Sequence, residues 1–275
     1  MRRAASRAWR AALLLGILVV LLAPLYWMVA ASLTPPVDIA DWPPHWFPAT
    51  PTLSNYRDAF ATQGFAGYLR NSLIVSTAST ALTLLVGSPA AYALARLRLP
   101  GRQVLLIGIL GLTMFPSLAV LLPLFSMLRA LGWLNTYQAL VFPYTAFNLP
   151  LTIWILTTFF QEIPRELEEA AEVDGAGVMT VLGRVVLPLA GPGLASAAIL
   201  VFIACWTEFL FALTFNSSDT MRTLPVGIAL FGGQFVVPWG TIFAGSVIAV
   251  LPLVVLVVLF QRLMITGLTR GAVKG

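Results

Sequence analysis

The sequence is poor in the residues on which most enzyme active sites depend. It contains one cysteine and one histidine among 275 residues. Because the single cysteine is Cys205, no disulfide forms within the chain. The single histidine is His45, so the chain has almost none of the histidines that a His-based metal site or a Ser-His-Asp triad requires. We therefore expect neither a catalytic site nor a metal site, and we expect the chain not to be an enzyme.

Lysine is equally scarce, since Lys274 is the only one and is the penultimate residue. A P-loop needs a lysine inside Gly-x-x-x-x-Gly-Lys-Ser/Thr, where it reaches the phosphates of a nucleotide. The chain has no such motif, so we expect it to hold no cofactor of its own. Any work driven by ATP requires a separate chain that binds ATP and Mg.

Charged residues make up 10% of the chain, whereas soluble domains carry about 25%. Hydrophobic residues make up 59%, and the mean hydropathy is +0.90. These values predict a polytopic membrane protein. The net charge of +5 comes almost entirely from arginines beside apolar runs, which indicates membrane orientation rather than a nucleic-acid partner.

Six apolar runs are each long enough to cross about 30 Å of hydrocarbon as a helix. They cover residues 11–33, 73–95, 103–128, 138–160, 189–215 and 240–260. The first run is followed by Thr34-Pro35-Pro36, which offers no small-x-small cleavage site, so we interpret it as a span rather than a signal peptide. The sequence thus predicts an all-α polytopic membrane protein with six transmembrane helices.

The distribution of basic residues predicts how these spans are oriented. Six spans place both termini on one side, and an N-terminus inside leaves twelve of the sixteen basic residues on cytoplasmic segments. The four outside are Arg57, Arg70, Arg129 and Arg222. Because cytoplasmic loops carry the excess of arginine and lysine, we expect a cytoplasmic N-terminal segment 1–10 and a cytoplasmic tail 261–275.

Two connecting segments and several prolines complete the expected architecture. Residues 34–68 are rich in proline and tryptophan, which predicts a loop at the membrane interface with a short helix at 55–60. Residues 216–238 are expected to form an external loop with a re-entrant or interfacial helix at 224–231. Prolines inside the spans either line cavities or are tolerated kinks. These prolines are Pro116, Pro123, Pro143, Pro150 and Pro252.

The most polar stretch of the chain is residues 161–188. Its first half holds six of the eleven carboxylates, namely Glu162, Glu166, Glu168, Glu169, Glu172 and Asp174. Pro164 suits a helix start and Gly175 a helix end, so we expect a helix at 164–174 and a second at 177–187 that Pro188 stops. Leu167, Ala170, Ala171 and Asp174 share one face of the first helix, which suits a groove on a partner.

This stretch also carries a resemblance to a known family. Glu169-Ala170-Ala171, Asp174-Gly175-Ala176 and Leu187-Pro188 with Pro192 resemble the EAA loop of binding-protein-dependent ABC-transporter permeases. The segments Asn55-Tyr56…Phe60 and Asn71-Ser72-Leu73 are typical of sugar permeases. From about residue 55 to the C-terminus the chain is most similar to the MalG-like subunits of maltose-type carbohydrate importers.

The resemblance implies a fold, a location and a set of partners. The fold is that of a type I ABC importer permease (MetI-like), with residues 1–275 as a single transmembrane permease domain in the cytoplasmic (inner) membrane. The partners are a sister permease in a heterodimer, two ATP-binding cassette ATPase subunits and an extracytoplasmic sugar-binding protein. The residues that couple to the ATPase are then Glu169, Ala170, Ala171, Asp174, Gly175 and Ala176. A solvated acidic loop between two spans remains the alternative.

Glu208 is the one carboxylate inside a predicted span. A charge at the centre of a bilayer costs about 2.5–3.5 kcal/mol on insertion scales, so this side chain should face the bundle interior or a wet cavity. Sugar permeases have Trp-Asn-Glu-Phe here, and this chain departs from them with Trp206-Thr207-Glu208-Phe209. We consider Glu208, Trp206 and Tyr144 as candidates for the substrate pathway. Helix packing or gating by Glu208, and ordinary packing of the two aromatic rings, are the alternatives.

Two other classes of protein are weakly supported. A secondary transporter driven by an ion gradient needs ionisable residues inside its spans, and Glu208 alone is thin support. An intramembrane enzyme needs a nucleophile and a base at depth, and neither a Ser–Lys nor a paired-carboxylate site is evident. The sequence therefore favours the permease subunit of an importer for a sugar or sugar-like solute, coupled to a separate ATPase through the EAA loop.

Overall fold

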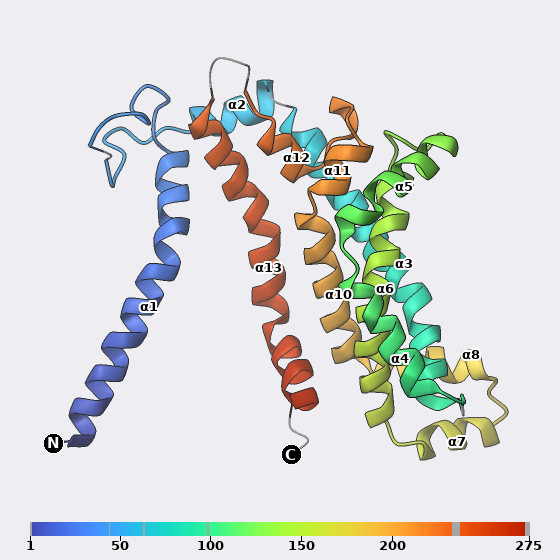
Figure 1. The fold of residues 1–275 in the computed structure, drawn as a ribbon. Helices are drawn as coiled ribbons and strands as arrows, with labels where there is room; N and C mark the ends of the chain where they lie inside the picture. The colour runs from blue at the N-terminus through green and yellow to red at the C-terminus, as the bar shows by residue number, and fades with distance from the viewer. Residues whose placement is uncertain (1, 44, 63, 98, 233–236, 273–275) are drawn as a thin grey trace. The chain divides into compact units, whose positions relative to one another are not determined.

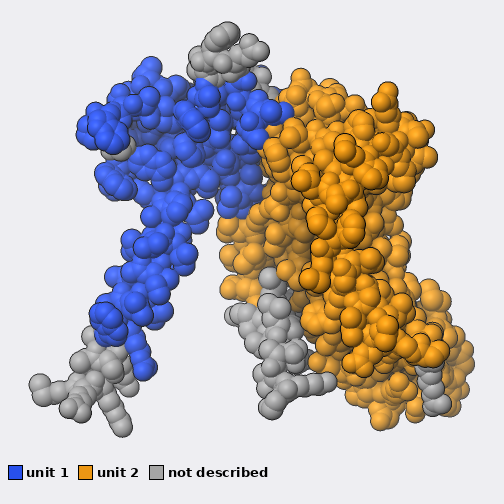
Figure 2. Space-filling model, in the orientation of Figure 1, with its two compact units in different colours: residues 1–66, 227–252 blue, residues 67–226, 253–275 orange. Residues whose placement is uncertain are grey.

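The structure is a computed structural model that describes residues 2–43, 45–62, 64–97, 99–232 and 237–272. Within these residues the chain forms helices, turns and loops and contains no strand, so the expected all-α class is confirmed (Figure 1). The chain divides into two compact units, residues 1–66 with 227–252 and residues 67–226 with 253–275 (Figure 2). Each unit is described by itself.

The first unit contains α1 (Arg2–Ser32), α2 (Ser54–Thr62) and the start of α13 (Trp239–Ala272). Asn55 of α2 is fully buried, and its amide donates hydrogen bonds to the carbonyls of Ser32 (2.9 Å) and Thr34 (2.8 Å). These bonds satisfy carbonyls that have no partner at the C-terminal end of α1. A Cβ on Gly240 would lie 2.4 Å from the Asn55 Oδ1, so the close approach of α13 requires glycine.

The second unit is built around α3 (Phe65–Arg96), α6 (Gln138–Glu162) and α10 (Gly191–Thr207). One stripe of α3 is made of buried small polar residues, and the Thr145 hydroxyl of α6 donates to the carbonyl of Ser79 in that stripe at 3.5 Å. Small residues let helix backbones approach closely in membranes, and hydroxyls supply hydrogen bonds between helices. The stripe consists of Ser72, Ser76, Ser79 and Thr83.

The third expected span, residues 103–128, is not one helix. It is divided into α4 (Arg102–Gly111), η1 (Leu112–Met114) and α5 (Ser117–Ala130), and the two arms meet at 86°. The break falls at Pro116, which has no N–H to donate and forces Phe115 into an extended conformation. Pro143 and Pro150, in contrast, lie inside α6, which continues through both.

The region of the fifth expected span, residues 189–215, is also broken. The helix α10 ends at Thr207, Glu208 is extended, and α11 (Leu210–Phe215) follows as a separate short helix. Before α10, the segment Val178–Leu189 meets Gly191–Thr207 at 82°. Within the described residues, four helices are long and apolar enough to cross a membrane, or six spans if each bent pair counts as one.

The remaining elements lie near the expected positions. The helices α2 and α12 (Leu224–Ala229) match the short helices expected at 55–60 and 224–231, and η3 (Asp219–Met221) precedes α12. Part of the expected external loop, residues 233–236, lies outside the described residues. The helix α13 continues beyond residue 260 to Ala272, so the segment expected to be a separate tail is helical over most of its length.

Candidate functional site

The acidic stretch forms a helix-turn-helix with a well-defined turn. The first helix is α7 (Glu166–Val173), and Gly175 after it has a φ of +85°, the left-handed conformation expected there. The Gly175 N–H donates to the Glu172 carbonyl and the Ala176 N–H to the Ala171 carbonyl, both at 2.9 Å. This pair of bonds is the Schellman motif, which satisfies the last carbonyls of a helix. The predicted end of the first helix at Gly175 is therefore confirmed.

The second helix differs from expectation at its far end. It consists of α8 (Val178–Val181), a π-helical turn η2 (Leu182–Val186) and α9 (Leu187–Leu189). Pro188 does not stop it, because the chain stays helical from the π-helical turn through Pro188 to Leu189. The helix instead ends at Leu189, before the bend that leads into α10.

Most of the predicted coupling residues face outward. Glu169, Ala170, Asp174 and Gly175 are exposed, whereas Ala171 and Ala176 are half-buried. Large apolar side chains are exposed beside them, with exposed fractions of 46% for Leu167, 88% for Val173, 57% for Val178 and 71% for Met179. Exposed apolar side chains next to carboxylates form a surface suited to a protein partner.

The inward side of α7 is held by a buried ion pair whose residues are not among those expected for the site. The Glu168 Oε1 lies 2.6 Å from Arg96 Nη2 at the end of α3, and both side chains are less than a tenth exposed. The Tyr92 hydroxyl donates to Glu168 Oε2 at 2.8 Å. The same Arg96 Nη2 donates to the Ile163 carbonyl at 2.7 Å, just before α7. Arg96 therefore joins α3 to both the start and the interior of the acidic stretch.

The available sequence signal for this cluster is the spacing of Tyr92 and Arg96. Residues four apart lie on one face of a helix, so these two side chains reach the same partner. The partner, Glu168, is 76 residues from Tyr92 in sequence, and it is one of six carboxylates in its stretch. The sequence alone does not single it out.

An apolar cluster surrounds the ion pair. The buried members come from the end of α3, the end of α6, the second helix of the acidic stretch and the start of α10, while Ile163, Ala171 and Ala176 pack against them. The Tyr92 ring contacts the Phe160 ring edge to face, with centroids 6.4 Å apart. The buried members are Ala91, Tyr92, Leu94, Ala95, Ile153, Leu156, Phe160, Val181, Leu182, Val186, Ala190 and Ala197.

The three residues considered for the substrate pathway lie close to one another. Tyr144 donates a hydrogen bond to Glu208 Oε2, and the Glu208 carboxylate also accepts the N–H groups of Phe211 (2.8 Å) and Ala212 (3.1 Å). Glu208 thus caps the N-terminus of α11, where a negative charge is favoured. Trp206 is 2% exposed and Tyr144 3% exposed, and the Trp206 ring stacks on Phe202 at 5.5 Å.

A cavity of about 240 Å³ lies where the third expected span bends, and its lining is apolar. Pro150, one of the prolines inside a span, is among the lining residues. Because these side chains offer no hydrogen-bonding groups, the cavity does not suit the hydroxyls of a sugar. The lining residues are Leu112, Phe115, Val120, Ala146, Phe147 and Pro150.

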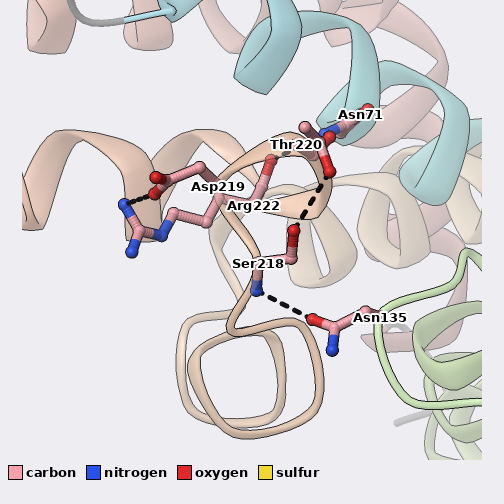
Figure 3. A network of polar contacts seen from close by, with 6 residues as sticks. All are labelled: Asn71, Asn135, Ser218, Asp219, Thr220 and Arg222. Carbon is pink, nitrogen blue, oxygen red and sulfur yellow. Dashed lines mark hydrogen bonds and ion pairs between the residues drawn. The ribbon is translucent and has the colours of Figure 1, made fainter.

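At the other end of α3 and α6, polar side chains hold the loop formed by residues 216–223 (Figure 3). The buried Asn71 amide donates to the carbonyls of Thr220 and Arg222 at 2.9 Å each, and its Oδ1 accepts the Tyr137 hydroxyl. The Asn135 Oδ1 accepts the Ser218 N–H at 2.8 Å. An ion pair between Asp219 and Arg222 lies on the same loop.

Known proteins resemble the chain over most of its length. Residues 65–270 match the family described as "Binding-protein-dependent transport system inner membrane component". The sulfoquinovosyl glycerol transport system permease protein of Agrobacterium fabrum is 45% identical over 92% of this chain and 88% of its own length. The trehalose/maltose transport system permease protein of Thermococcus litoralis is 44% identical over 94% of this chain and 93% of its own length.

The fold is also found among solved structures. A bacterial ABC transporter involved in the import of the acidic polysaccharide alginate aligns with a TM-score of 0.80. The alignment covers 95% of this chain and 98% of the matched chain, at 24% sequence identity. At this identity the match shows that the two chains share a fold.

Proposed function

Because the chain belongs to the binding-protein-dependent transport system inner membrane components, we propose that it is the permease subunit of an ATP-driven importer for a sugar or sugar-like solute. The chain is a multi-pass membrane protein with the type I ABC importer permease fold. In the proposal, residues 1–275 act as one transmembrane permease domain, with the N- and C-termini in the cytoplasm. The chain is not catalytic, because a separate subunit hydrolyses ATP.

The main support for a role in ATPase coupling is that one side of α7 is fastened to the protein while the other side is exposed. One side of the helix is fastened through Glu168, and the other side exposes Glu169, Ala170 and Val173. The motif that resembles the EAA loop thus lies on a surface with both apolar and acidic groups. A groove on an ATPase subunit with apolar walls and a basic rim would complement it.

The partners follow from this assignment. A sister permease forms a heterodimer with this chain, two ATP-binding cassette subunits bind ATP and Mg in the cytoplasm, and an extracytoplasmic binding protein delivers the solute. The family description, which names dependence on a binding protein, supports the last of these. The two permease relatives act on a sulfoquinovosyl glycerol and on trehalose or maltose by name, which supports a carbohydrate solute here.

For the substrate pathway we propose that Glu208 and Tyr144 act by holding the helix break between α10 and α11, with Trp206 packed beside it. The Glu208 carboxylate already accepts three hydrogen bonds, two from the backbone and one from Tyr144. An ion-gradient transporter needs a carboxylate that exchanges its proton or ion during transport. These bonds argue against that role for Glu208 and therefore against a secondary transporter.

The test is ATP hydrolysis by the full complex in lipid nanodiscs, with the binding protein loaded in turn with trehalose, maltose and sulfoquinovosyl glycerol. We expect at least one loaded form to stimulate hydrolysis by the unaltered complex. Glu169→Ala and Gly175→Pro should abolish the stimulation or release the ATPase subunits. Asp41→Ala is the matched control, because it removes an exposed carboxylate from the proline-rich loop outside the residues that match the family.

Two results would overturn the proposal. If Glu169→Ala and Gly175→Pro both hydrolyse ATP and import solute like the unaltered complex, the acidic stretch is only a linker. If none of the carbohydrates stimulates hydrolysis while an amino acid or an inorganic ion does, the solute class is wrong.

A further inference from the structure

The helix α7 is exposed over most of its surface, yet one buried carboxylate ties it to α3. Glu168 reaches inward, while its neighbours Leu167 and Glu169 are exposed. A carboxylate buried without a partner is strongly unfavourable, so the position of Glu168 is set by the groups that pair with it. Those groups belong to α3 and not to α7 itself.

The pairing is directional as well as electrostatic. Arg96 approaches Glu168 Oε1 and Tyr92 donates to Oε2, so each carboxylate oxygen has its own partner on α3. Because these partners are four residues apart on one helix face, they fix the position and the orientation of the carboxylate. A rotation or a slide of α7 along α3 would break at least one of the two contacts.

A third contact fixes the start of the helix. Arg96 Nη2 donates to the Ile163 carbonyl three residues before Glu166, the first residue of α7. Ile163, Ala171 and Ala176 pack against the apolar cluster that contains Tyr92 and Phe160. The two ends of α7 are therefore fastened to the body that contains the end of α3.

We propose that Arg96 and Tyr92 are positioning residues for ATPase coupling, because they hold Glu168 so that α7 and the adjoining end of α3 move as one rigid body. This inference rests on the proposed coupling role of α7. A push on the exposed face of α7 then displaces α3 rather than bending the loop. Since α3 continues as one helix from Arg96 back to Asn71, the displacement reaches the residue that holds the loop 216–223.

The test measures the distance between spin labels at Leu97 and Val173 in the full complex, in a background where Cys205→Ala removes the single cysteine. Both sites are exposed, at 51% and 88%, and they report on the end of α3 and the end of α7. Distances are measured without nucleotide and after trapping with MgATP and vanadate. Loss of ATP hydrolysis confirms that the complex is trapped.

In the unaltered complex we expect a narrow distance distribution whose mean does not shift between the two states. Glu168→Gln should broaden the distribution and shift its mean on trapping, while the ATPase still co-purifies. Tyr92→Phe removes only the hydrogen bond to Glu168 and should broaden the distance distribution less than Glu168→Gln does. The exchange of charges, Arg96→Glu with Glu168→Arg, restores the attraction, so its distance distribution should be narrower than that of Glu168→Gln.

The proposal is overturned if the mean distance shifts on trapping in the unaltered complex. It is also overturned if the distance distribution of Glu168→Gln stays narrow and its mean does not shift. Should the exchanged pair fail to assemble, the graded comparison of Tyr92→Phe with Glu168→Gln decides the question. The rigid-body inference can fail while the proposed coupling role of α7 holds, and the two failures give different results. If Glu169→Ala uncouples the ATPase but the labels show independent motion, only the rigid-body inference is wrong.

Discussion

The two loops at opposite ends of α3 and α6 are fastened in different ways. The acidic helix-turn-helix is held at its inward side by one ion pair and two hydrogen bonds around Glu168, and its outer surface is exposed. The loop 216–223 is held by neutral amides that pair with its backbone at several points along its length. Figure 1 shows α7 and α11 at opposite ends of α6.

This difference indicates two mechanical roles. A loop held at many backbone positions has several contacts that keep its shape, because each neutral hydrogen bond contributes about 1 kcal/mol and the loss of one leaves the other contacts in place. The helix α7 is held at one buried site, by the ion pair and by the apolar cluster around it, and not along its exposed face. The first arrangement suits a surface that must present a constant face, and the second suits an element that is displaced as a unit.

The largest expected effect comes from removing the arginine of the charged cluster. Arg96→Met leaves Glu168 buried without its cation, and breaking a buried pair in this way costs about 3–5 kcal/mol. Equilibrium unfolding of the purified subunit in mixed detergent micelles measures the loss. Arg96→Lys keeps the charge and should lose much less. Equal losses for the two variants would show that the fit of the side chain, and not the charge, holds α7.

A smaller effect is expected at the opposite loop. Asn71→Ala leaves the carbonyls of Thr220 and Arg222 without their donor, which costs about 1–3 kcal/mol. Because the remaining amides still hold the loop, hydrogen exchange of residues 216–223 should rise only in part. Ser218→Ala, which removes a hydroxyl contact at the protein surface, is the control and should change little. If residues 216–223 lost all protection from hydrogen exchange in Asn71→Ala, this loop would also depend on a single contact, and the two loops would not differ in how they are held.

The turn after α7 should respond locally. Gly175 has a positive φ, so Gly175→Ala costs about 1 kcal/mol and should speed hydrogen exchange at residues 175 and 176. The matched control is Gly177→Ala, because Gly177 has an ordinary φ of −75° and no atom within 4 Å of an added Cβ. A slower exchange in Gly175→Ala than in Gly177→Ala would contradict the assignment of the turn.

The smallest effect is expected for the ion pair of the loop 216–223, whose carboxylate is exposed. The Asp219 side chain is 75% exposed, and exposed pairs contribute less than about 1 kcal/mol. Asp219→Asn should therefore leave unfolding and ATP hydrolysis unchanged, in contrast to Glu168→Gln. A loss comparable to that of Glu168→Gln would show that the charge on this loop also matters.

The sequence predicts the helices better than the breaks and contacts between them. Hydrophobic run lengths locate α1, α3, α6 and α13, because an apolar run of about twenty residues has few other stable conformations in a membrane. The same run lengths conceal the interruptions at Pro116 and Glu208. The break at Pro116 depends on tertiary packing, since α6 continues through two prolines without a break.

The acidic stretch shows the same division between local and distant information. The closing conformation of Gly175 follows from local chemistry, and the sequence predicts it. The selection of Glu168 as the inward carboxylate depends on Arg96, which lies on another helix. Pairings between distant segments arise from the fold as a whole, so no local pattern in one sequence reveals them.

The contacts of Glu208 have a consequence for how the chain is made. Two of its hydrogen-bond donors, Phe211 and Ala212, leave the ribosome after it, but Tyr144 was synthesised 64 residues earlier. A carboxylate that enters the bilayer is stabilised when a donor is already there. Of the three donors that stabilise Glu208, only the Tyr144 hydroxyl on α6 is therefore made before the carboxylate itself.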